Sequence, residues 1–221
     1  MIVRAYNEAS VIRETITGLL GLGFQVAVVD DGSTDETWAV MQQLPIHRVR
    51  HPINLGPGAA FQTIVEYALR QGADVVVNFD ADGQHRVEDI QVLLEPLFAG
   101  NADVVLGSRF LRSGDAQSIP LVRRVVLQGA RLVNFLFTGM WLSDAHNGLR
   151  AMTRHAASCL DLRETGFAYA TEMLEQIRHH RLRCVECPTH IRYTEYSLAK
   201  GQRLSNALNI FLDLIVGRMV R

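Results

Sequence analysis

Cysteine and lysine are scarce in this chain. Its 221 residues include three cysteines, Cys159, Cys184 and Cys187, and a single lysine, Lys200. Three cysteines are too few for a disulfide scaffold. Cys184 and Cys187 lie in a β-like run over residues 183–193, where positions three apart face opposite sides of a sheet, so we interpret them as structural residues rather than as half of a zinc or redox site. Arginine supplies the other basic residues, which suits bidentate contacts to phosphate, although a bias in genome composition would explain it equally well.

An excess of charge of one sign and a long apolar run are also absent. Lys and Arg number 22 against 23 Asp and Glu, for a net charge of −1. Since nucleic-acid-binding modules are normally basic, we expect no nucleic-acid partner. No apolar run reaches the ~18 residues of a membrane-spanning helix, and no signal peptide follows Met1. We expect one cytoplasmic domain, residues 1–221, with peripheral contact to the inner face of the membrane left open.

Short apolar segments alternate with helical patterns over residues 1–110. Beyond the apolar start at Ile2 and Val3, strands are predicted at 26–29, 46–50, 73–79 and 103–106, and helices at 9–20, 33–43, 57–70 and 87–98. Ser33 and Glu36 form a predicted capping box. The alternation predicts an α/β fold with a mainly parallel sheet, in which ligands bind at the carboxyl ends of the strands.

Two amphipathic helices are predicted in the second half of the chain, at 121–142 and 205–220. The first carries Arg124, Gln128 and Arg131 on one face. Such helices suit a protein core, a homodimer interface through the C-terminal helix, or a membrane surface with arginines near lipid phosphates. The sequence leaves these interpretations open.

Two acidic motifs and a glycine-rich loop follow predicted strands. Asp80 and Asp82 stand two apart, so in extended backbone both carboxylates point the same way and can converge on Mg²⁺ or Mn²⁺. Asp30 and Asp31 can accept hydrogen bonds from a base or ribose, and the glycines around Gly56 allow close backbone approach to a ligand. A solvated acidic turn and a helix N-cap are the alternative interpretations of the two acidic motifs.

These motifs form an ordered set. The residues concerned are Ala5-Tyr6-Asn7-Glu8, Val29-Asp30-Asp31-Gly32-Ser33-Thr34-Asp35, Asn54-Leu55-Gly56-Pro57-Gly58-Ala59-Ala60, Phe79-Asp80-Ala81-Asp82-Gly83-Gln84-His85, Gly107-Ser108-Arg109 and Asn147-Gly148-Leu149-Arg150. With them the chain resembles the family 2 glycosyltransferases, which implies a GT-A-type nucleotide-diphospho-sugar transferase fold with helices on both faces of the sheet. The D-A-D-G-Q-H form is most similar to the branch of dolichol-phosphate mannosyltransferase and bacterial polyprenyl-phosphate glycosyltransferases. Arg4 departs from the pattern, because the family usually has proline there.

The resemblance implies a role for each matching residue, with residues 1–110 as the nucleotide-sugar half and 111–221 as the acceptor half. The expected donor-binding residues are Ala5, Tyr6, Glu8, Asp30, Asp31, Gly56, Asp80 and Lys200. The expected metal ligands are Asp80, Asp82 and Gln84. The expected acceptor-binding residues are Arg123, Arg124, Arg131, Asp144, Arg192 and Ser197. The expected catalytic residues are Asp82, Arg109 and Glu172.

The predicted reaction is inverting transfer of a sugar from a UDP- or GDP-linked donor to a polyprenyl phosphate, with a divalent cation, Mg²⁺ or Mn²⁺, as cofactor. A saccharide hydroxyl is the alternative acceptor. It must lose a proton, and Glu172 is the candidate base, with a simple helix N-terminal charge as the other interpretation. Two further alternatives are a haloacid-dehalogenase-type phosphohydrolase, which also places D-x-D-G after a strand, and an inactive nucleotide-sugar-binding subunit.

Overall fold

The computed structural model describes residues 1–111, 129, 131, 135–136, 138–145 and 147–191. Its strands are β1 (Ile2–Ala5), β2 (Ala27–Asp30), β3 (His47–Arg50), β4 (Val75–Asp80), β5 (Val104–Ser108), β6 (Arg150–Thr153) and β7 (Cys184–Pro188). Its helices are α1 (Ile12–Gly21), α2 (Thr37–Gln42), α3 (Pro57–Arg70), α4 (Asp89–Phe98), α6 (Arg154–Ser158) and α7 (Tyr169–His179). The predicted strands and helices of the first half are all present, with ends shifted by a few residues.

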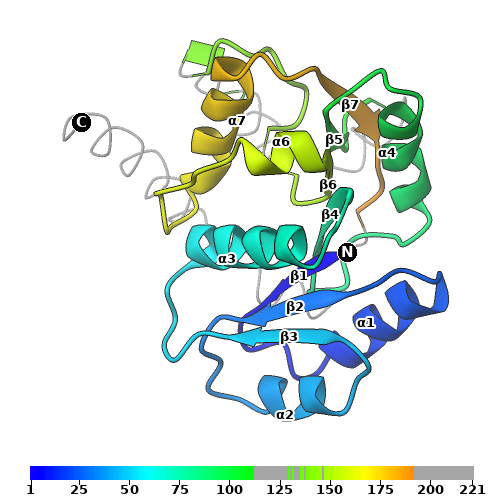
Figure 1. Cartoon of the computed structure of the whole chain (residues 1–221), viewed down its shortest axis with the longest axis vertical. Helices are drawn as coiled ribbons and strands as arrows, with labels where there is room; N and C mark the ends of the chain where they lie inside the picture. The colour runs from blue at the N-terminus through cyan, green and yellow to red at the C-terminus, as the bar shows by residue number, and fades with distance from the viewer. Residues whose placement is uncertain (112–128, 130, 132–134, 137, 146, 192–221) are drawn as a thin grey trace.

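The described strands form one seven-stranded sheet in the order β3-β2-β1-β4-β6-β5-β7, which runs from bottom to top in Figure 1. The pairs β1–β2, β1–β4, β2–β3 and β5–β7 are parallel, whereas β6 is antiparallel to both of its neighbours, β4 and β5. The prediction of an α/β fold with a mainly parallel sheet is confirmed. Strands from both halves of the chain share this sheet, because β6 and β7 join β1–β5.

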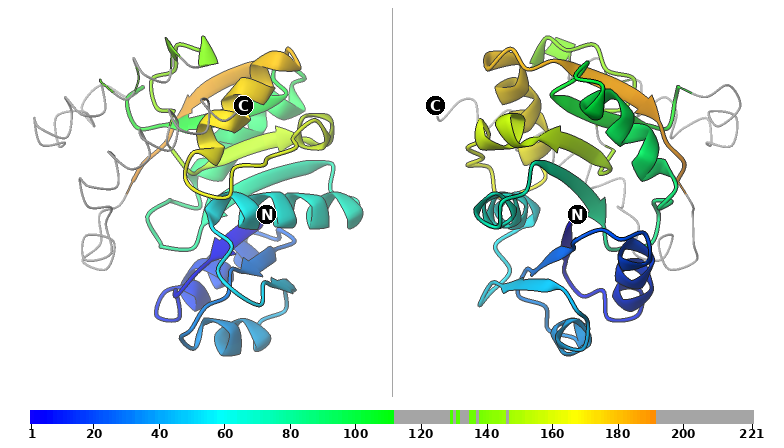
Figure 2. Two further views of the ribbon diagram at one scale, coloured as in Figure 1. Left: turned by 90° about the vertical axis from the view of Figure 1, so that its left-hand side faces the viewer. Right: turned by 45° about the vertical axis from the view of Figure 1, so that its right-hand side comes forward.

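The sheet is covered by helices on both faces, as Figure 2 shows. Alternate residues of a strand point to opposite faces, so Val29 of β2 packs in the core beside α3, α6 and α7, while Val28 packs in the core beside α1, α2 and α4. Phe61 and Ile64 of α3 are fully buried on the first face, where an amphipathic helix places its apolar stripe. The two apolar faces fix the strand register, and with it the loops at the strand ends.

Cys184 and Cys187 of β7 follow the same alternation. Cys184 packs against the core beside α3, and Cys187 packs against the core beside α1 and α4. Both thiols are free. The prediction that the two cysteines face opposite sides is confirmed.

The predicted capping box at Ser33 and Glu36 is wrong. Helix α2 begins at Thr37, and no capping-box bond forms at its start. Ser33 instead accepts a hydrogen bond at Oγ from the backbone N–H of Asn7, at 2.9 Å, while Asp35 accepts the N–H of Thr37, at 2.9 Å. The serine is used to join two loops, so it is not available to the helix.

The predicted helix over 121–142 lies mostly outside the described residues, and its expected end is wrong. Residues 139–142 are not helical. Gly139 has a φ of 66° and donates its N–H to the carbonyl of Phe135, at 2.7 Å, as glycines that end helices do. Arg124, Gln128 and the predicted helix over 205–220 lie outside the described residues. Within the described part of the chain, no helix has the length and apolar character needed to cross a membrane.

Candidate active site

The candidate site lies along one edge of the sheet. Strands β1, β2, β4, β5 and β7 all run in the same direction, so the loops that follow them meet at this edge, where parallel α/β sheets bind their ligands. Because β6 runs the other way, the segment before it reaches the same edge. The site segments are 6–8, 31–35, 81–85, 109–111, 147–149 and 189–191.

The loop after β1 is bonded to the loop after β2. Asn7 adopts a left-handed backbone, with a φ of 56°, and its Oδ1 accepts the N–H of Thr34, at 2.9 Å. Glu8 donates its N–H to the hydroxyl of Thr37, at 2.8 Å. Tyr6, at 41% exposure, presents its ring at the surface. The backbone of this predicted nucleoside pocket is therefore held in place by polar side chains of its own loops.

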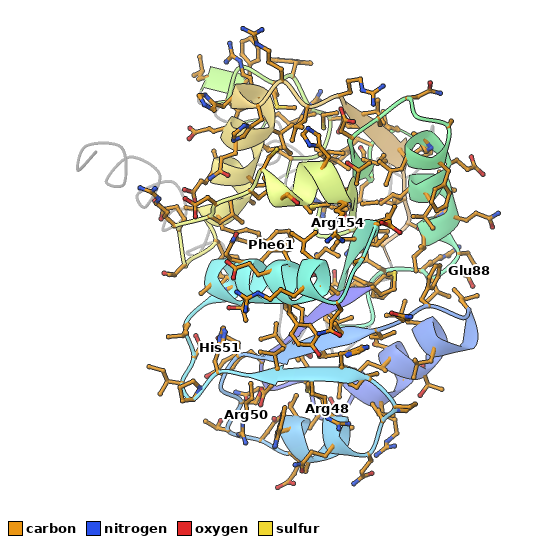
Figure 3. All side chains as sticks on the ribbon, in the orientation of Figure 1. Arg48, Arg50, His51, Phe61, Glu88 and Arg154 are labelled. Atoms are coloured by element: carbon orange, nitrogen blue, oxygen red, sulfur yellow. The ribbon has the colours of Figure 1, made fainter. Side chains whose placement is uncertain are left out.

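Asp31 holds the glycine-rich loop. Its Oδ1 accepts the N–H of Leu55, at 2.9 Å, and is 2.7 Å from Nδ1 of His51, while its Oδ2 accepts the N–H of Gly56, at 2.9 Å. His51 also contacts Thr63 of α3 through Nε2, at 3.0 Å. Figure 3 shows His51 at the end of β3, on the side that faces α3. Asp31 thus joins the ends of β2 and β3 to the start of α3.

Asp30 is bonded to its own loop and to β3. Its side chain is fully buried, accepts the N–H of Ser33 at 3.0 Å, and lies 3.1 Å from Nε of Arg50. Arg50 in turn lies over the ring of Trp38 in α2. Figure 3 shows Arg50 on the side of β3 that faces α2. These contacts bind Asp30 to its own loop and to β3, and its contact with the donor stays a prediction. Ala5 is also a core residue, with 2% exposure, so only its backbone can border the pocket.

Asp80 ends β4 between two basic side chains. Its Oδ1 accepts a hydrogen bond from Nη2 of Arg4, at 2.8 Å, and its Oδ2 lies 3.3 Å from Nε2 of His85. Burial works to raise the pKa of Asp80, but the hydrogen bond with His85 and the charge of Arg4 hold that pKa well below its ordinary value. The backbone of Gly148 packs so closely on the carboxylate that a Cβ would overlap Oδ2. Asp80 is therefore ionised and fixed in orientation.

Asp82 lies two residues further on, in the turn after β4. Burial raises the pKa of its carboxyl, and the negative charges of Asp80 and Glu8 add to the rise, against a hydrogen bond from the N–H of Gln84 at 3.0 Å. The two carboxylates therefore repel each other across a shared site. A cation between them would relieve that repulsion. This donor set fits an oxygen-coordinated divalent ion.

The candidate metal ligands are few. No group of three or more His, Cys, Asp and Glu side chains suited to a metal is found among the described residues. Asp80, Asp82 and the amide of Gln84 would supply only part of a coordination shell. Mg²⁺ and Mn²⁺ commonly take one or two carboxylates from the protein and the remaining ligands from water and substrate phosphates. The site fits an ion that arrives with a phosphate-bearing substrate.

Arg109, directly after β5, is held by Asp144. The carboxylate of Asp144 accepts Nε and Nη2 of Arg109, at 2.6 and 2.7 Å, and its backbone N–H at 3.1 Å. Asp144 is 4% exposed, and the Arg109 side chain is 17% exposed. This bidentate geometry fixes the plane of the guanidinium, so the structure brings together a predicted catalytic residue and a predicted acceptor residue.

Glu172 lies in the first turn of α7. Its Oε2 accepts the backbone N–H groups of Arg163 and Glu164, at 3.0 and 2.9 Å. The segment it holds packs on the glycine-rich loop, where Gly58 donates its N–H to the carbonyl of Thr165, at 2.7 Å. These bonds are those of a residue that orders a loop, which agrees with the helix N-terminal interpretation of Glu172. Its role as a base stays a prediction.

The remaining predicted acceptor residues are mostly outside the described part of the chain. Arg131 is described: its Nε donates to the carbonyl of Leu142, at 2.9 Å, and its guanidinium lies over the exposed ring of Trp141. The predicted acceptor residues outside the described ranges are Arg123, Arg124, Arg192 and Ser197, and the predicted donor residue Lys200 lies outside them as well.

Three further residues, which stand in none of the motifs, contact the site residues or the turns that hold them. Arg4 was noted only as a departure from the family pattern, yet it pairs with Asp80, its register partner across β1 and β4. His51, which shows no ligand spacing in the sequence, binds Asp31. Glu186 of β7 accepts the backbone N–H groups of Ser143 and Asp144. A polar residue inside a strand or directly at its end is the signal that could have identified all three, because such a group needs a partner when it is buried.

Comparison with known proteins assigns the family. Residues 1–160 match the model of glycosyl transferase family 2, so the chain belongs to this family. The chain is 30% identical over 99% of its length to the UDP-N-acetylglucosamine–dolichyl-phosphate N-acetylglucosaminyltransferase of Methanococcus voltae, of which it covers 95%. It is also 30% identical, over 90% of its length, to the polyprenol monophosphomannose synthase of Mycolicibacterium smegmatis, of which it covers 78%.

A solved structure agrees in fold. The glucosyl-3-phosphoglycerate synthase of Mycobacterium tuberculosis, in complex with Mn²⁺, UDP-glucose and phosphoglyceric acid, superposes with a TM-score of 0.72. The match covers 97% of this chain and 76% of the synthase, at 19% sequence identity. The predicted family and the predicted GT-A fold are confirmed. The chain is a glycosyltransferase, which removes the phosphohydrolase alternative.

Proposed function

We propose that this glycosyltransferase moves a sugar from a nucleotide-diphosphate sugar to a polyprenyl phosphate. The observation that carries the proposal is the pair Asp80 and Asp82 at the end of β4, beside the loops after β1 and β2. Relatives named for transfer to dolichyl phosphate and for polyprenol monophosphomannose synthesis match nearly the whole chain. Both the site and the relatives favour a donor with a diphosphate and an acceptor with a phosphate.

The donor half of the proposal rests on the first three loops. The backbone of residues 6–8 and the rim around Gly56 would border the nucleoside, and Asp31 would act mainly by holding that rim in place. Asp82, with Asp80 and Gln84, would hold a divalent cation. When bound, the cation would neutralise the charge that develops on the departing diphosphate.

The acceptor half rests on the chemistry of the attacking group. An oxygen of the lipid phosphate forms the new bond to the anomeric carbon, on the face opposite the diphosphate, which leaves with the electron pair of the broken bond. A phosphate is already anionic, so no base has to remove a proton. It requires cations to hold it near the negatively charged donor. Arg109, oriented by Asp144, is the described residue that we assign to a phosphate.

Contact with the membrane surface follows from this acceptor. A polyprenyl phosphate is confined to a bilayer, so the chain must reach the lipid headgroup without a spanning helix in its described part. Trp141 and the apolar side chains beside it are exposed near Arg131. Tryptophan and arginine are suited to the interfacial region of a bilayer. We therefore propose a peripheral position on the membrane.

A saccharide hydroxyl is the competing acceptor, and Glu172 distinguishes the two. Both backbone N–H groups bind the same oxygen, Oε2. The variant Glu172→Gln can keep both bonds with its carbonyl oxygen while losing the ability to take a proton. With a phosphate acceptor we expect a loss of less than about tenfold in kcat, whereas removal of a general base commonly costs about 10²–10⁴.

The test is a transfer assay with the full chain, Mn²⁺, a panel of radiolabelled UDP- and GDP-linked sugars, and undecaprenyl or dolichyl phosphate in detergent. We expect label to enter a solvent-extractable lipid product with one donor of the panel. Transfer to soluble saccharides alone would support the competing acceptor. Donor binding without transfer to any acceptor would support the inactive-subunit alternative.

A further inference from the structure

A second carboxylate lies behind the pair of Arg109 and Asp144. Glu186, in the middle of β7, accepts the backbone N–H of Ser143 at both oxygens, at 2.9 and 2.8 Å, and its hydroxyl at 2.7 Å. The Oε1 of Glu186 also accepts the N–H of Asp144, at 3.0 Å. Both backbone N–H groups of this turn therefore end on one side chain.

We infer that Glu186 is a positioning residue that sets the orientation of Arg109 through Asp144. The inference rests on the proposed function only where it assigns Arg109 to a phosphate. Glu186 is anchored on the sheet, since β7 pairs with β5 and Leu106 is its register partner. The turn that carries Asp144 is an irregular segment. Its position is set by these bonds to the strand.

The hydrogen-bonding capacity of Glu186 matches this role. An ionised carboxylate only accepts hydrogen bonds, and Glu186 receives them from two N–H groups and a hydroxyl. Among the described residues it forms no ion pair, whereas Asp144 is paired with the cation Arg109. The contacts therefore form a series: the carboxylate of Glu186 binds the backbone N–H groups of Ser143 and Asp144, and the carboxylate of Asp144 binds the guanidinium of Arg109. Each member depends on the one before it for its direction.

A second connection reaches the backbone on the far side of Arg109. The hydroxyl of Ser143 is bonded to that of Ser108, which accepts the N–H of Phe110 at 3.1 Å. Asp144 itself accepts the N–H of Arg109. The turn that Glu186 anchors thus bonds directly to residues 108 and 109, and the hydroxyl of Ser108 extends this connection to Phe110. Loss of Glu186 would release this segment together with the guanidinium.

The first test measures the geometry without any donor or acceptor. Phenylglyoxal modifies arginine side chains, and peptide mass spectrometry gives a rate for each site. In Glu186→Gln we expect Arg109 to react about fivefold faster than in the wild type, as expected for the loss of about one hydrogen bond. Arg4 is the internal reference, because its side-chain exposure of 14% is close to the 17% of Arg109. General unfolding would accelerate both sites. An unchanged rate at Arg109, or acceleration of both sites, overturns the inference.

The second test asks whether Glu186 acts through Arg109. In the assay of the proposed function, Glu186→Gln should lower kcat/KM for the lipid phosphate by about tenfold. In an Arg109→Lys background, which keeps a cation beside Asp144 but loses the bidentate contact, the same change should cost less than about twofold. Glu66→Gln, on the exposed face of α3, is the matched control and should leave kcat/KM unchanged. Equal losses in the two backgrounds would show that Glu186 acts elsewhere.

The two tests separate the inference from the proposed function. Faster modification of Arg109 in Glu186→Gln, with unchanged transfer kinetics, would overturn the assignment of Arg109 to a phosphate. It would still support the inference that Glu186 positions Arg109. Absence of transfer in the wild type would contradict the proposed function, yet the labelling result would still decide whether Glu186 positions Arg109.

Discussion

At the scale of single residues, the two carboxylates of the D-A-D motif have different environments. Asp80 is bonded to Arg4 and His85, which keeps it ionised, whereas Asp82 has a backbone N–H as its donor and a pKa raised first by burial. The oxygens of Asp82 therefore have fewer bonds to basic side chains than the oxygens of Asp80 and are more available to a cation. We expect Asp82 to contribute more than Asp80 to the affinity for a cation.

The first prediction concerns this difference. Asp82→Ala should abolish the Mn²⁺-dependent part of nucleotide-sugar binding, because it removes the carboxylate whose oxygens are more available to the cation. The fold should be unaffected, since the turn keeps its backbone. Calorimetric titration of UDP- and GDP-sugars with and without Mn²⁺ measures the effect, and circular dichroism checks the fold. An unchanged dependence on Mn²⁺ in the variant would refute the assignment of Asp82.

The second prediction concerns Arg4. Arg4→Met keeps an apolar stem beside Phe61 and Tyr169 but leaves Asp80 without its cation. The free energy of unfolding should fall by about 2 kcal/mol, because a partly buried carboxylate loses its charged partner. Urea unfolding at neutral pH measures this change. Arg70→Met is the control: its pair with Glu66 is exposed on both sides, so a change within about 0.5 kcal/mol is expected. Equal effects of the two variants would contradict the account.

At the scale of secondary-structure elements, the two edge strands of the sheet, β3 and β7, differ. Strand β3 carries His47, Arg48 and Arg50, and charged side chains on an edge strand oppose pairing with another chain. Arg48 also donates to the carbonyl of Leu44, just past the end of α2, at 2.9 Å, and to those of Met41 and Gln42 in α2, each at 3.4 Å. Figure 3 shows Arg48 directed to that helix. At the other edge, β7 is joined to β5 by the ion pair of Asp103 and Arg183, the residues directly before the two strands.

The third prediction concerns that pair. Asp103 accepts the backbone N–H of Arg183 at 2.8 Å and two hydrogen bonds from its guanidinium, and these bonds lower the pKa of Asp103 from 3.8 to about 2. Because the folded chain favours the carboxylate, the stabilisation is complete above pH 3.8 and is lost as the pH falls through about 2. Asp103→Asn should therefore lower the urea midpoint at pH 6, and this difference from the wild type should disappear near pH 2.

Asp161→Asn is the control for the third prediction. Its pair with Arg163 is exposed on both sides, at 77% and 76%, so little change in the midpoint is expected at either pH. A difference between wild type and Asp103→Asn that persists at low pH would show that the asparagine disturbs the junction of β5 and β7 by another route.

The sequence determined the elements of the first half because each strand there is apolar, short and followed by a turn motif. Residues 150–153 were not predicted as a strand, since R-A-M-T has one strongly β-favouring residue and begins with an arginine. That arginine, Arg150, is 2% exposed and donates to the carbonyls of Asn147 and Ala145. Partners of this kind come from tertiary structure, so periodicity alone could not identify them.

The same distinction applies to the candidate site. Asp80, Asp82 and Arg109 could be selected from motifs, because residue type and spacing carry the chemistry. The partners Arg4, His51 and Glu186 belong to none of these motifs, and each acts on a residue at least 20 positions away. Their polar character inside a strand or at its end shows only that they need a partner and does not identify that partner. Asp30 and Asp31 also share one motif context and are both buried, so only their partners distinguish them: Ser33 and Arg50 for Asp30, and the glycine-rich loop with His51 for Asp31.

At the scale of the whole molecule, the two halves of the chain meet at the glycine-rich loop. The segment 163–166, from the second half, packs on Gly56 and Gly58, which belong to the first half. A side chain at Gly58 would overlap the carbonyl oxygen of Glu164 and the Cβ of Tyr169. The position of the glycine-rich loop is therefore set jointly by both halves.

The fourth prediction follows from this contact. Gly58→Ala should lower the free energy of unfolding by about 2 kcal/mol through overpacking, and should weaken donor binding because the rim shifts. Gly21→Ala at the end of α1 is the control, since an added Cβ meets nothing within 4 Å. Urea unfolding and donor titration measure the two effects. Wild-type behaviour of Gly58→Ala would show that segment 163–166 moves aside without cost.

The reversed strand β6 has a consequence for synthesis on the ribosome. It is the only strand that joins β1–β4 to β5 and β7 in the described sheet, and it is encoded after residue 149. Until β6 has been synthesised, β4 is an edge strand with unpaired backbone N–H and C=O groups. Such an edge can pair with other chains. Translation pauses before this point should therefore promote aggregation, and pauses after it should be tolerated.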